Sequence, residues 1–241
     1  MNRYRVYAVV YSSLILGLGS LMLFLAFLYL GSFTIINLGL EPIWTLVLDA
    51  GLSLLFFVQH SVMIRRGIQE RLSKHVPDVY YSAFYAIASG TALLAVMVFW
   101  QKTSVVIADA NGIYRIILRA LFFLPIAGFA WGNSSLRAFD PFGVNKIRRH
   151  IHNKETRPMP LAIRGAYRWL RHPLYFFSLV MIWSCPDLTS DRLLFNSMWS
   201  AWIVFATILE ERDLVLDFGD QYREYQAKVP MIIPYKLPGR G

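Results

Sequence analysis

The chain has 241 residues, of which 56% are hydrophobic and 16% are charged, and its formal net charge is +9. Soluble domains average roughly 25% charged residues, so this composition excludes an ordinary soluble domain and indicates that lipid is the solvent. A single cysteine excludes an intramolecular disulfide and a cysteine-based metal cluster, and the positive charge is typical of cytoplasmic membrane loops rather than of nucleic-acid binding.

Six apolar segments follow one another along the chain. They cover residues 6–30, 44–63, 80–100, 114–136, 174–186 and 193–209. The first four are long enough to cross the hydrocarbon core, which takes about 20 helical residues, and the first is predicted to be a retained helix rather than a cleaved signal peptide. The fifth would be only about 20 Å long as a helix, so the last two are predicted to form a short, tilted or partly re-entrant hairpin.

The sequence therefore predicts an all-α, polytopic integral membrane bundle with five to six transmembrane helices, in which the whole chain is one membrane domain. The tail from Asp213 to Lys236 mixes charged and aromatic residues, and it is predicted to be a cytoplasmic amphipathic helix ended by Pro230 and Pro234. Asp49, inside the second segment, needs a partner or a proton in apolar surroundings.

The distribution of basic residues predicts the orientation. With a cytoplasmic N-terminus, the cytoplasmic segments hold two Lys/Arg before the first helix, four after the second, nine between residues 137 and 171, and five after Glu211. Of the 24 basic residues, the other side keeps Lys102, Arg115, Arg119 and Arg192. This asymmetry predicts that both termini are cytoplasmic, and a bacterial inner membrane is the expected location.

Three polar clusters stand at helix ends that this topology brings to the cytoplasmic leaflet. They lie at the end of the second segment, the start of the fifth and the end of the sixth, in that order: Gln59, His60, Ser61, Met63 and Arg65; Arg171, His172, Pro173 and Tyr175; Glu210, Glu211 and Arg212. Polar groups from three helices at one surface are what a functional site requires, and chance would scatter them over both leaflets.

The first two clusters also have purely structural interpretations. Arg171 and His172 before a helix are typical of a headgroup anchor, with Pro173 in the first helical turn, where its missing N–H costs nothing. A histidine such as His60 on an apolar helix is more often a hydrogen-bonded packing group than a ligand.

The acidic pair is harder to explain by structure alone. Glu210 and Glu211 at the predicted end of a helix oppose the helix dipole, and carboxylates near a membrane are rare unless they are paired. They therefore need a cation. No metal site is predicted, because His150 and His152 stand in a basic loop, and no obligate protein partner is indicated.

The clusters and the tail carry a resemblance to a known family. An ordered series runs Arg171-His172-Pro173-Leu174-Tyr175, Glu210-Glu211, Phe218-Gly219, Tyr222, Tyr225, Val229-Pro230 and Ile233-Pro234. It resembles the C-terminal core, over about residues 165–236, of the isoprenylcysteine carboxyl methyltransferase and phospholipid methyltransferase superfamily. Three further motifs resemble the methanethiol S-methyltransferase family of membrane enzymes: Phe57-Val58-Gln59-His60-Ser61-Val62-Met63, Phe139-Asp140-Pro141-Phe142-Gly143 and Leu209-Glu210-Glu211-Arg212-Asp213-Leu214. The related NnrU-type membrane proteins share parts of the first of these.

The resemblance implies transfer of a methyl group from S-adenosylmethionine to a small thiol, with methanethiol as the expected acceptor and dimethyl sulfide as the product. It implies a cofactor pocket formed by the last helices and the tail. His172, Tyr175 and one of Glu210 and Glu211 would line this pocket.

The local chemistry agrees with that implication. The carboxylate of the methionine moiety would be favoured at the positive N-terminus of the fifth helix, and its ammonium group by a Glu carboxylate. Its sulfonium would be favoured by aromatic faces such as those of Tyr167, Trp169 and Tyr175. The expected cofactor-binding residues are Tyr167, Arg171, His172, Pro173, Tyr175, Glu210 and Glu211.

Methylation of a thiol requires the thiolate, because the thiol is a much weaker nucleophile. His60 is predicted to be the base, with Arg65 or Arg171 favouring the anion. The expected acceptor contacts are Gln59, His60, Ser61 and Met63, and the expected apolar walls are Phe56, Phe57, Val62 and Met63.

Three other functions are compatible with the sequence. The first is a methyltransferase that acts on isoprenylcysteine or on an amine headgroup. The second is a non-catalytic protein of nitrogen-oxide metabolism, with His60 and His172 as haem or metal ligands. The third is an NADPH-dependent reductase, which would need a longer chain.

Overall fold

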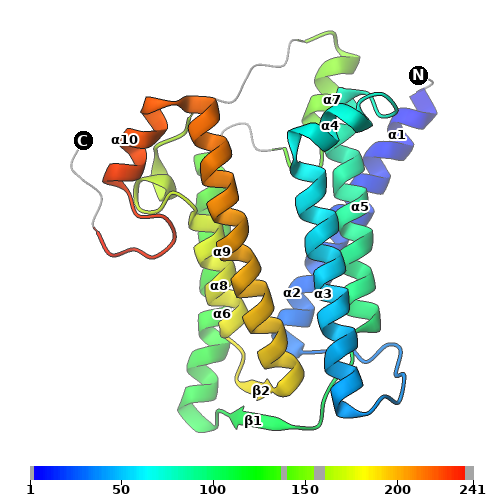
Figure 1. The fold of residues 1–241 in the computed structure, drawn as a ribbon, viewed down its shortest axis with the longest axis vertical. Coiled ribbons are helices and arrows are strands. Elements are labelled where there is room, and N and C mark those ends of the chain that lie inside the picture. The colour runs from blue at the N-terminus through cyan, green and yellow to red at the C-terminus, as the bar shows by residue number, and fades with distance from the viewer. Residues whose placement is uncertain (1–2, 137–139, 155–160, 237–241) are drawn as a thin grey trace. The chain divides into compact units, whose positions relative to one another are not determined.

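The computed structural model describes residues 3–136, 140–154 and 161–236. They form two compact units, and each is described by itself. Unit 1 comprises residues 1–105, 140–158 and 190–195, and unit 2 comprises residues 106–139, 159–189 and 196–241. Helices dominate both units (Figure 1).

Unit 1 is built around the helix α5. In chain order its elements are α1 (Arg3–Ser12), the π-helical η1 (Ser13–Leu18), α2 (Gly19–Leu30), α3 (Pro42–Ile64), α4 (Arg66–Leu72), α5 (Asp78–Phe99) and α7 (Val144–Ile151). The first three follow one another without a break and form the first predicted span. The helix α5 contacts both this span and α3.

A close approach of two backbones fixes the packing of α5 on the first span. A Cβ atom added to Gly90 in α5 would lie 2.1 Å from the carbonyl oxygen of Leu16 in η1. Only glycine leaves room for this contact, in the way that small residues allow membrane helices to approach each other closely.

Buried polar side chains close one end of unit 1. Asp49 in α3 accepts a hydrogen bond at 2.9 Å from the backbone N–H of Gln101, which confirms that this carboxyl has a partner. Asp191 accepts bonds from the backbone N–H of Thr103 at 3.0 Å and from its hydroxyl at 2.7 Å. Arg192 donates at 2.6 Å to a carbonyl group in the last turn of α2, where a cation is favoured.

Unit 2 packs a short helix against a long one. Its elements are β1 (Val106–Asp109), α6 (Gly112–Ser135), the 3₁₀-helical η2 (Gly165–Arg168), α8 (Pro173–Trp183), β2 (Asp187–Thr189), α9 (Ser190–Phe218, of which the first six residues belong to unit 1) and α10 (Asp220–Lys228). At Gly128 and Gly132 of α6, an added Cβ atom would lie 2.5 Å from Phe177 and from Leu174 of α8, respectively. These two glycines therefore seat α8 directly on α6.

A two-stranded sheet joins the start of α6 to the end of α8. The strands β1 and β2 pair antiparallel, with Asp109 opposite Asp187. Arg115 forms ion pairs with both carboxylates, at 2.7 Å in the case of Asp109. The 11 residues of α8 make a helix of about 16 Å, so the prediction of a short fifth helix is confirmed.

The helix α9 corrects the sequence prediction. It runs for 29 residues from Ser190 to Phe218, well beyond the predicted segment 193–209. Glu210 and Glu211 therefore lie inside the helix, about two turns before its end, and not at a C-terminus where they would oppose the dipole. Their side chains are hydrogen-bonded to other parts of unit 2, which removes the reason for the helix to stop there. It ends at Gly219, whose φ of 56° suits glycine.

The tail forms the predicted amphipathic helix over a shorter range. The helix α10 buries Tyr222 and Tyr225 and leaves Arg223 and Glu224 exposed. It ends at Lys228, just before Pro230, because a proline cannot continue a helix.

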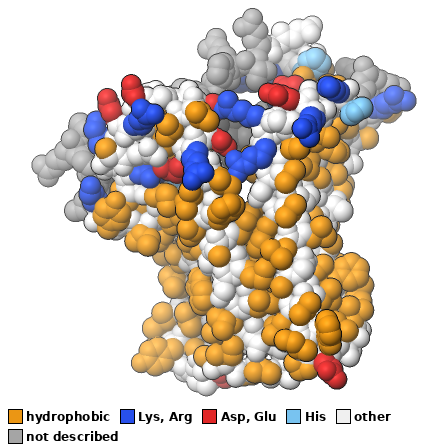
Figure 2. All heavy atoms as spheres, in the orientation of Figure 1, with side chains coloured by type: hydrophobic (Ala, Val, Ile, Leu, Met, Phe, Trp, Pro, Cys, Tyr) orange, Lys and Arg blue, Asp and Glu red, His pale blue; other side chains and the backbone are white. Residues whose placement is uncertain are grey.

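The surface of the long helices suits a membrane. For each unit taken by itself, Figure 2 shows hydrophobic side chains along the helices and Lys and Arg side chains near one end of them. In the described part of the chain, five stretches are long and apolar enough to span a bilayer: Tyr4–Leu30, Pro42–Ile64, Asp78–Phe99, Gly112–Ser135 and Ser190–Phe218. The prediction of an all-α, polytopic membrane bundle is confirmed.

The different surroundings of Gly90 and Gly51 predict different effects of glycine-to-alanine substitution on stability. Gly90→Ala should lower the free energy of unfolding by about 1–3 kcal/mol, because the new methyl group overpacks against η1. Gly51→Ala in α3 has no atom within 4 Å of the added Cβ and should be neutral or stabilising, since alanine is the better helix former. Thermal unfolding in detergent measures both. A Gly90→Ala protein that melts at or above the wild-type temperature would contradict the packing.

Candidate active site

The beginning of α8 is held by the tail that follows α10. His172 occupies the position before the helix and Pro173 its first turn, as predicted. The backbone N–H of Arg171 donates to the carbonyl oxygen of Pro230 at 2.9 Å, and that of His172 donates to Met231 at 3.0 Å. The tail is therefore bound to α8 by main-chain hydrogen bonds.

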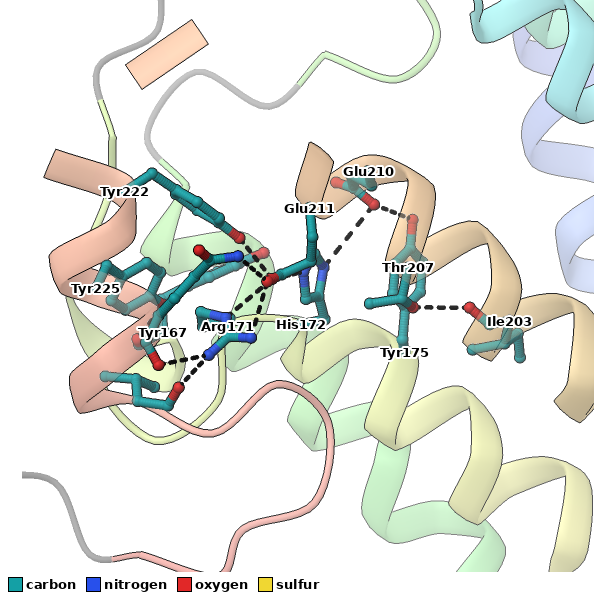
Figure 3. Close-up of polar contacts among 12 residues, drawn as sticks. Tyr167, Arg171, His172, Tyr175, Ile203, Thr207, Glu210, Glu211, Tyr222 and Tyr225 are labelled. Carbon is teal, nitrogen blue, oxygen red and sulfur yellow. Dashed lines mark hydrogen bonds and ion pairs between the residues drawn. The ribbon is translucent and has the colours of Figure 1, made fainter. Parts of the chain in front are cut away.

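The carboxylate of Glu211 is the centre of a buried polar network (Figure 3). The guanidinium of Arg171 donates to both of its oxygens, at 2.9 Å from Nε and 2.8 Å from Nη2. His172 Nε2 lies 2.7 Å from Oε1, the Tyr222 hydroxyl donates to the same oxygen at 2.7 Å, and Gln226 Nε2 donates to Oε2 at 2.6 Å. One carboxylate thus connects α9 to the start of α8 and to α10.

The guanidinium of Arg171 forms hydrogen bonds only within this network, among those found in the described residues. Besides its two bonds to Glu211, its Nη1 donates to the carbonyl oxygens of Gln226 at 3.0 Å and Val229 at 2.5 Å. The side chains of Arg171 and Glu211 are only 10% and 9% exposed. Two buried opposite charges in bidentate contact compensate each other, so this pair explains how Glu211 is tolerated inside α9.

Glu210 has a different environment, although it is adjacent in sequence. Its side chain is 44% exposed, and its Oε2 accepts a hydrogen bond from the Tyr175 hydroxyl at 2.6 Å. His172 Nδ1 lies 3.8 Å from the same oxygen. The His172 and Tyr175 rings are stacked, with centroids 5.5 Å apart. Both side chains therefore approach Glu210 from the same side (Figure 3).

A cavity of about 240 Å³ opens beside these residues. Arg171, His172, Tyr175 and Glu210 contribute to its lining. The remaining walls are aromatic and aliphatic, and include Tyr167, Leu174, Leu214, Phe218, Tyr222 and Tyr225. The cavity therefore combines one partly exposed carboxylate with several aromatic faces.

Three of the tyrosine hydroxyls around this cavity remain protonated. Burial raises the pKa of Tyr167, Tyr222 and Tyr225 above the ordinary value of 10.0. The hydrogen bond to Glu211 raises the pKa of Tyr222 further, and the negative charge of Glu210 does the same for Tyr167. At physiological pH these side chains are therefore neutral donors, as the bond from Tyr225 to the Tyr167 carbonyl oxygen at 2.5 Å illustrates.

The predicted residues of the second segment lie in unit 1, where they meet α5. His60 Nε2 is 2.7 Å from the Tyr85 hydroxyl. Gln59 Nε2 donates to Ser89 at 3.3 Å, and it lies 3.0 Å from the sulfur of Met63. Ser61 and Arg65 lie in the last turn of α3 and directly after it. The predicted convergence of this cluster with the other two stays a prediction.

Within unit 2 the structure brings together the residues predicted to bind the cofactor. Of the three aromatic residues considered for the sulfonium, Tyr167 and Tyr175 line the cavity and Trp169 does not. Phe139, in one of the motifs, lies outside the described residues.

Sequence reasoning did not identify Gln226 or Tyr85 as members of a site. The sequence around each residue gives no indication of a functional role, because each acts through a hydrogen bond to a residue distant in sequence. Among the residues that the structure describes, no group of three or more His, Cys, Asp or Glu side chains could hold a metal ion.

Comparison with known proteins identifies relatives over most of the chain. A methanethiol S-methyltransferase from Crocosphaera subtropica is 31% identical over 191 residues, which are 79% of this chain and 75% of the relative. One from Mycobacterium tuberculosis is 33% identical over 181 residues, 75% of this chain and 74% of the relative. Nurim from Bos taurus is 27% identical over 178 residues, 70% of this chain and 68% of the relative.

No protein-family profile and no solved structure matches the chain. The identity and the coverage of the two bacterial enzymes nevertheless establish kinship, and they agree with the motifs that pointed to the same enzymes. The chain belongs to the methanethiol S-methyltransferase family.

Proposed function

We propose that this protein methylates methanethiol to dimethyl sulfide with S-adenosylmethionine as the methyl donor. The observation that carries the choice of donor is the charge balance of the cavity. Glu211 is compensated by Arg171, whereas Glu210 has no Lys or Arg partner among the described residues and is partly exposed to the cavity. A net negative site with aromatic walls favours a cationic ligand, and kinship with methanethiol S-methyltransferases supports the acceptor.

The residues present fit this donor. Glu210 would bind the ammonium group, held in place by the hydroxyl of Tyr175, and the faces of Tyr167 and Tyr222 would lie beside the sulfonium. When bound, S-adenosylmethionine would supply an electrophilic methyl carbon, which a thiolate attacks in line with the carbon–sulfur bond that breaks, so that the neutral thioether of the donor leaves. The contribution of the protein is to position and to exclude water, and the aliphatic walls of the cavity serve the second purpose.

Arg171 is assigned a positioning role in this proposal. Its guanidinium is bound to Glu211 and to the last carbonyl groups of α10. We therefore do not retain it as the direct partner of a thiolate. It would instead keep α8, α9 and α10 in register, so that Tyr175 meets Glu210.

His60 is retained as the proposed base, now with Tyr85 as its partner. A free alkyl thiol is mostly protonated at neutral pH, so the site must accept a proton. The hydrogen bond to Tyr85 would fix the orientation of the imidazole ring, as a partner on the other ring nitrogen does in many enzymes. The acceptor contacts of Gln59, Ser61 and Met63, and the role of Arg65, belong to the same proposal.

The proposed location is a bacterial inner membrane with both termini in the cytoplasm. Twenty of the 24 basic residues support this orientation through the positive-inside rule. The donor is a charged cytoplasmic metabolite, so a cavity at the cytoplasmic face would be accessible to it. The acceptor and the product are small and apolar enough to cross the bilayer.

The proposed reaction predicts a volatile product. Purified protein incubated with S-adenosylmethionine and methanethiol should release dimethyl sulfide, measured in the headspace by gas chromatography. Parallel incubations with hydrogen sulfide and with a prenylcysteine test the acceptor. Methylation of the prenylcysteine alone would refute the proposed substrate but leave the donor site intact.

Two adjacent glutamates should respond differently to the same substitution. Glu210→Gln should raise the KM for S-adenosylmethionine about tenfold to a hundredfold, because it removes a charge-assisted hydrogen bond, and should leave the melting temperature close to wild type. Glu211→Gln should cost about 3–5 kcal/mol of stability, since it leaves Arg171 buried without a counter-charge. Steady-state kinetics and thermal unfolding separate the two effects.

Glu224→Gln is the matched control for this pair. Its side chain is 74% exposed on α10, so its effect should remain within about 0.5 kcal/mol, with unchanged kinetics. If Glu210→Gln lowered the melting temperature as much as Glu211→Gln and left the KM unchanged, the assignment of Glu210 to the donor would be wrong.

The base assignment is tested by the pH dependence of turnover. His60→Ala should lower kcat about 100-fold or more near neutrality, and the loss should diminish as the pH rises toward the pKa of the acceptor thiol, because a growing fraction of the acceptor is then already thiolate and needs no base. Tyr85→Phe should give a smaller loss of the same kind. The exposed His75 provides the control, His75→Ala. Wild-type turnover of His60→Ala from about pH 6 to 9 would rule out this histidine as the base.

A further inference from the structure

The helix α7 is anchored firmly to unit 1 through one face. Ile147 is 1% exposed and packs with Val6 of α1 and Ala83 of α5. Lys146 Nζ forms an ion pair at 2.7 Å with Asp78 at the start of α5. The helix is preceded by Gly143, which has a φ of 69° and a backbone so close to α5 that an added Cβ atom would lie 2.8 Å from the Ala83 nitrogen. This face is fully used for packing.

The other face of α7 carries an unbalanced positive charge. Residues 144–154 include four Lys or Arg residues and two His residues but no Asp or Glu. Lys146 is neutralised by Asp78. Arg148, Arg149 and His150 are exposed, and no carboxylate from the described parts of the chain forms an ion pair with them. A cluster of this kind attracts an anion.

A groove of about 520 Å³ runs between α7 and the start of the first span. Its apolar lining includes Val10 of α1, Tyr80 of α5 and Ile151 of α7, and Arg148, His150 and His152 also line it. Apolar side chains are left open there, since Tyr7 is 52% and Ile151 is 47% exposed. The groove therefore has an apolar floor and a basic rim.

We propose that this groove binds one anionic phospholipid. The phosphate would lie against Arg148, with His150 and His152 beside it, and the glycerol and upper acyl chain would cover Tyr7, Val10 and Ile151. The placement supports a lipid rather than a soluble anion, because the groove includes the second turn of a membrane span, Tyr4–Leu30. Tyrosines at this depth are typical of the membrane interface, and basic pockets there bind lipid headgroups.

Neighbouring arginines on one helix provide a sharp test. Arg148 lines the groove and Arg149 does not, yet both substitutions Arg148→Gln and Arg149→Gln remove one charge from an exposed position of α7. Native mass spectrometry of the purified full-length protein measures the binding of dioleoylphosphatidylglycerol and of dioleoylphosphatidylcholine. Arg148→Gln should weaken phosphatidylglycerol binding about fivefold, whereas Arg149→Gln should change it less than twofold.

Further measurements distinguish a lipid groove from diffuse charge attraction, from a phosphate site and from a dimer contact. Ile151→Gln should weaken the binding of both lipids, because it removes part of the apolar floor, while the melting temperature of each variant should stay near wild type. Equal losses for Arg148→Gln and Arg149→Gln would mean diffuse attraction and overturn the site. Displacement of the lipid by inorganic phosphate at the same concentration would indicate a phosphate site instead. A dimer without bound phosphatidylglycerol would assign the groove to a second copy of the chain.

Discussion

The bidentate contact between Arg171 and Glu211 is the interaction on which unit 2 depends. Both side chains are almost fully buried, and each would be very costly without the other. Through their remaining hydrogen bonds they reach His172, Tyr222 and Gln226, and the carbonyl groups at the end of α10. The start of α8, the interior of α9, α10 and the tail therefore share one electrostatic centre, and the walls of the cavity are fixed with respect to it.

This centre explains why two adjacent glutamates have different properties. Neighbouring residues on a helix point about 100° apart. Glu211 is therefore directed toward Arg171 and α10, while Glu210 is directed toward Tyr175 and the cavity. The first carboxylate is paired with an arginine, and the second has no Lys or Arg partner among the described residues. A site that holds a cationic methyl donor needs such an uncompensated carboxylate next to a rigid framework, and the pair supplies both from consecutive positions.

Much of the architecture could be predicted from the sequence, because lipid imposes a simple rule of length and hydrophobicity. The four long apolar segments and the short fifth helix are confirmed. The extent of α9 was not predicted, since Glu210, Glu211 and Arg212 look like the end of an apolar run, and only the distant Arg171 makes the burial of Glu211 tolerable. For the same reason no local signal distinguished the two glutamates or identified Gln226. The proposed core of residues 165–236, and the meeting of its cavity with Gln59 and His60, stay predictions.

The two units use charge in contrasting ways at their polar ends. In unit 2 Arg171 and His172 face inward to Glu211, and the carboxylate of Glu210 remains partly exposed. In unit 1 Lys146 forms an ion pair with Asp78, and Arg148 remains exposed beside an apolar groove. Each surface thus contains one ion pair, which is buried for Arg171–Glu211 and exposed on the Asp78 side for Lys146–Asp78, and one further charged residue that has no Lys, Arg, Asp or Glu partner among the described residues. That further residue can bind an external partner of the opposite charge. A cationic donor suits the first, and an anionic headgroup suits the second. The sign of the residual charge, rather than the basic total of the chain, therefore determines which ligand each surface can bind.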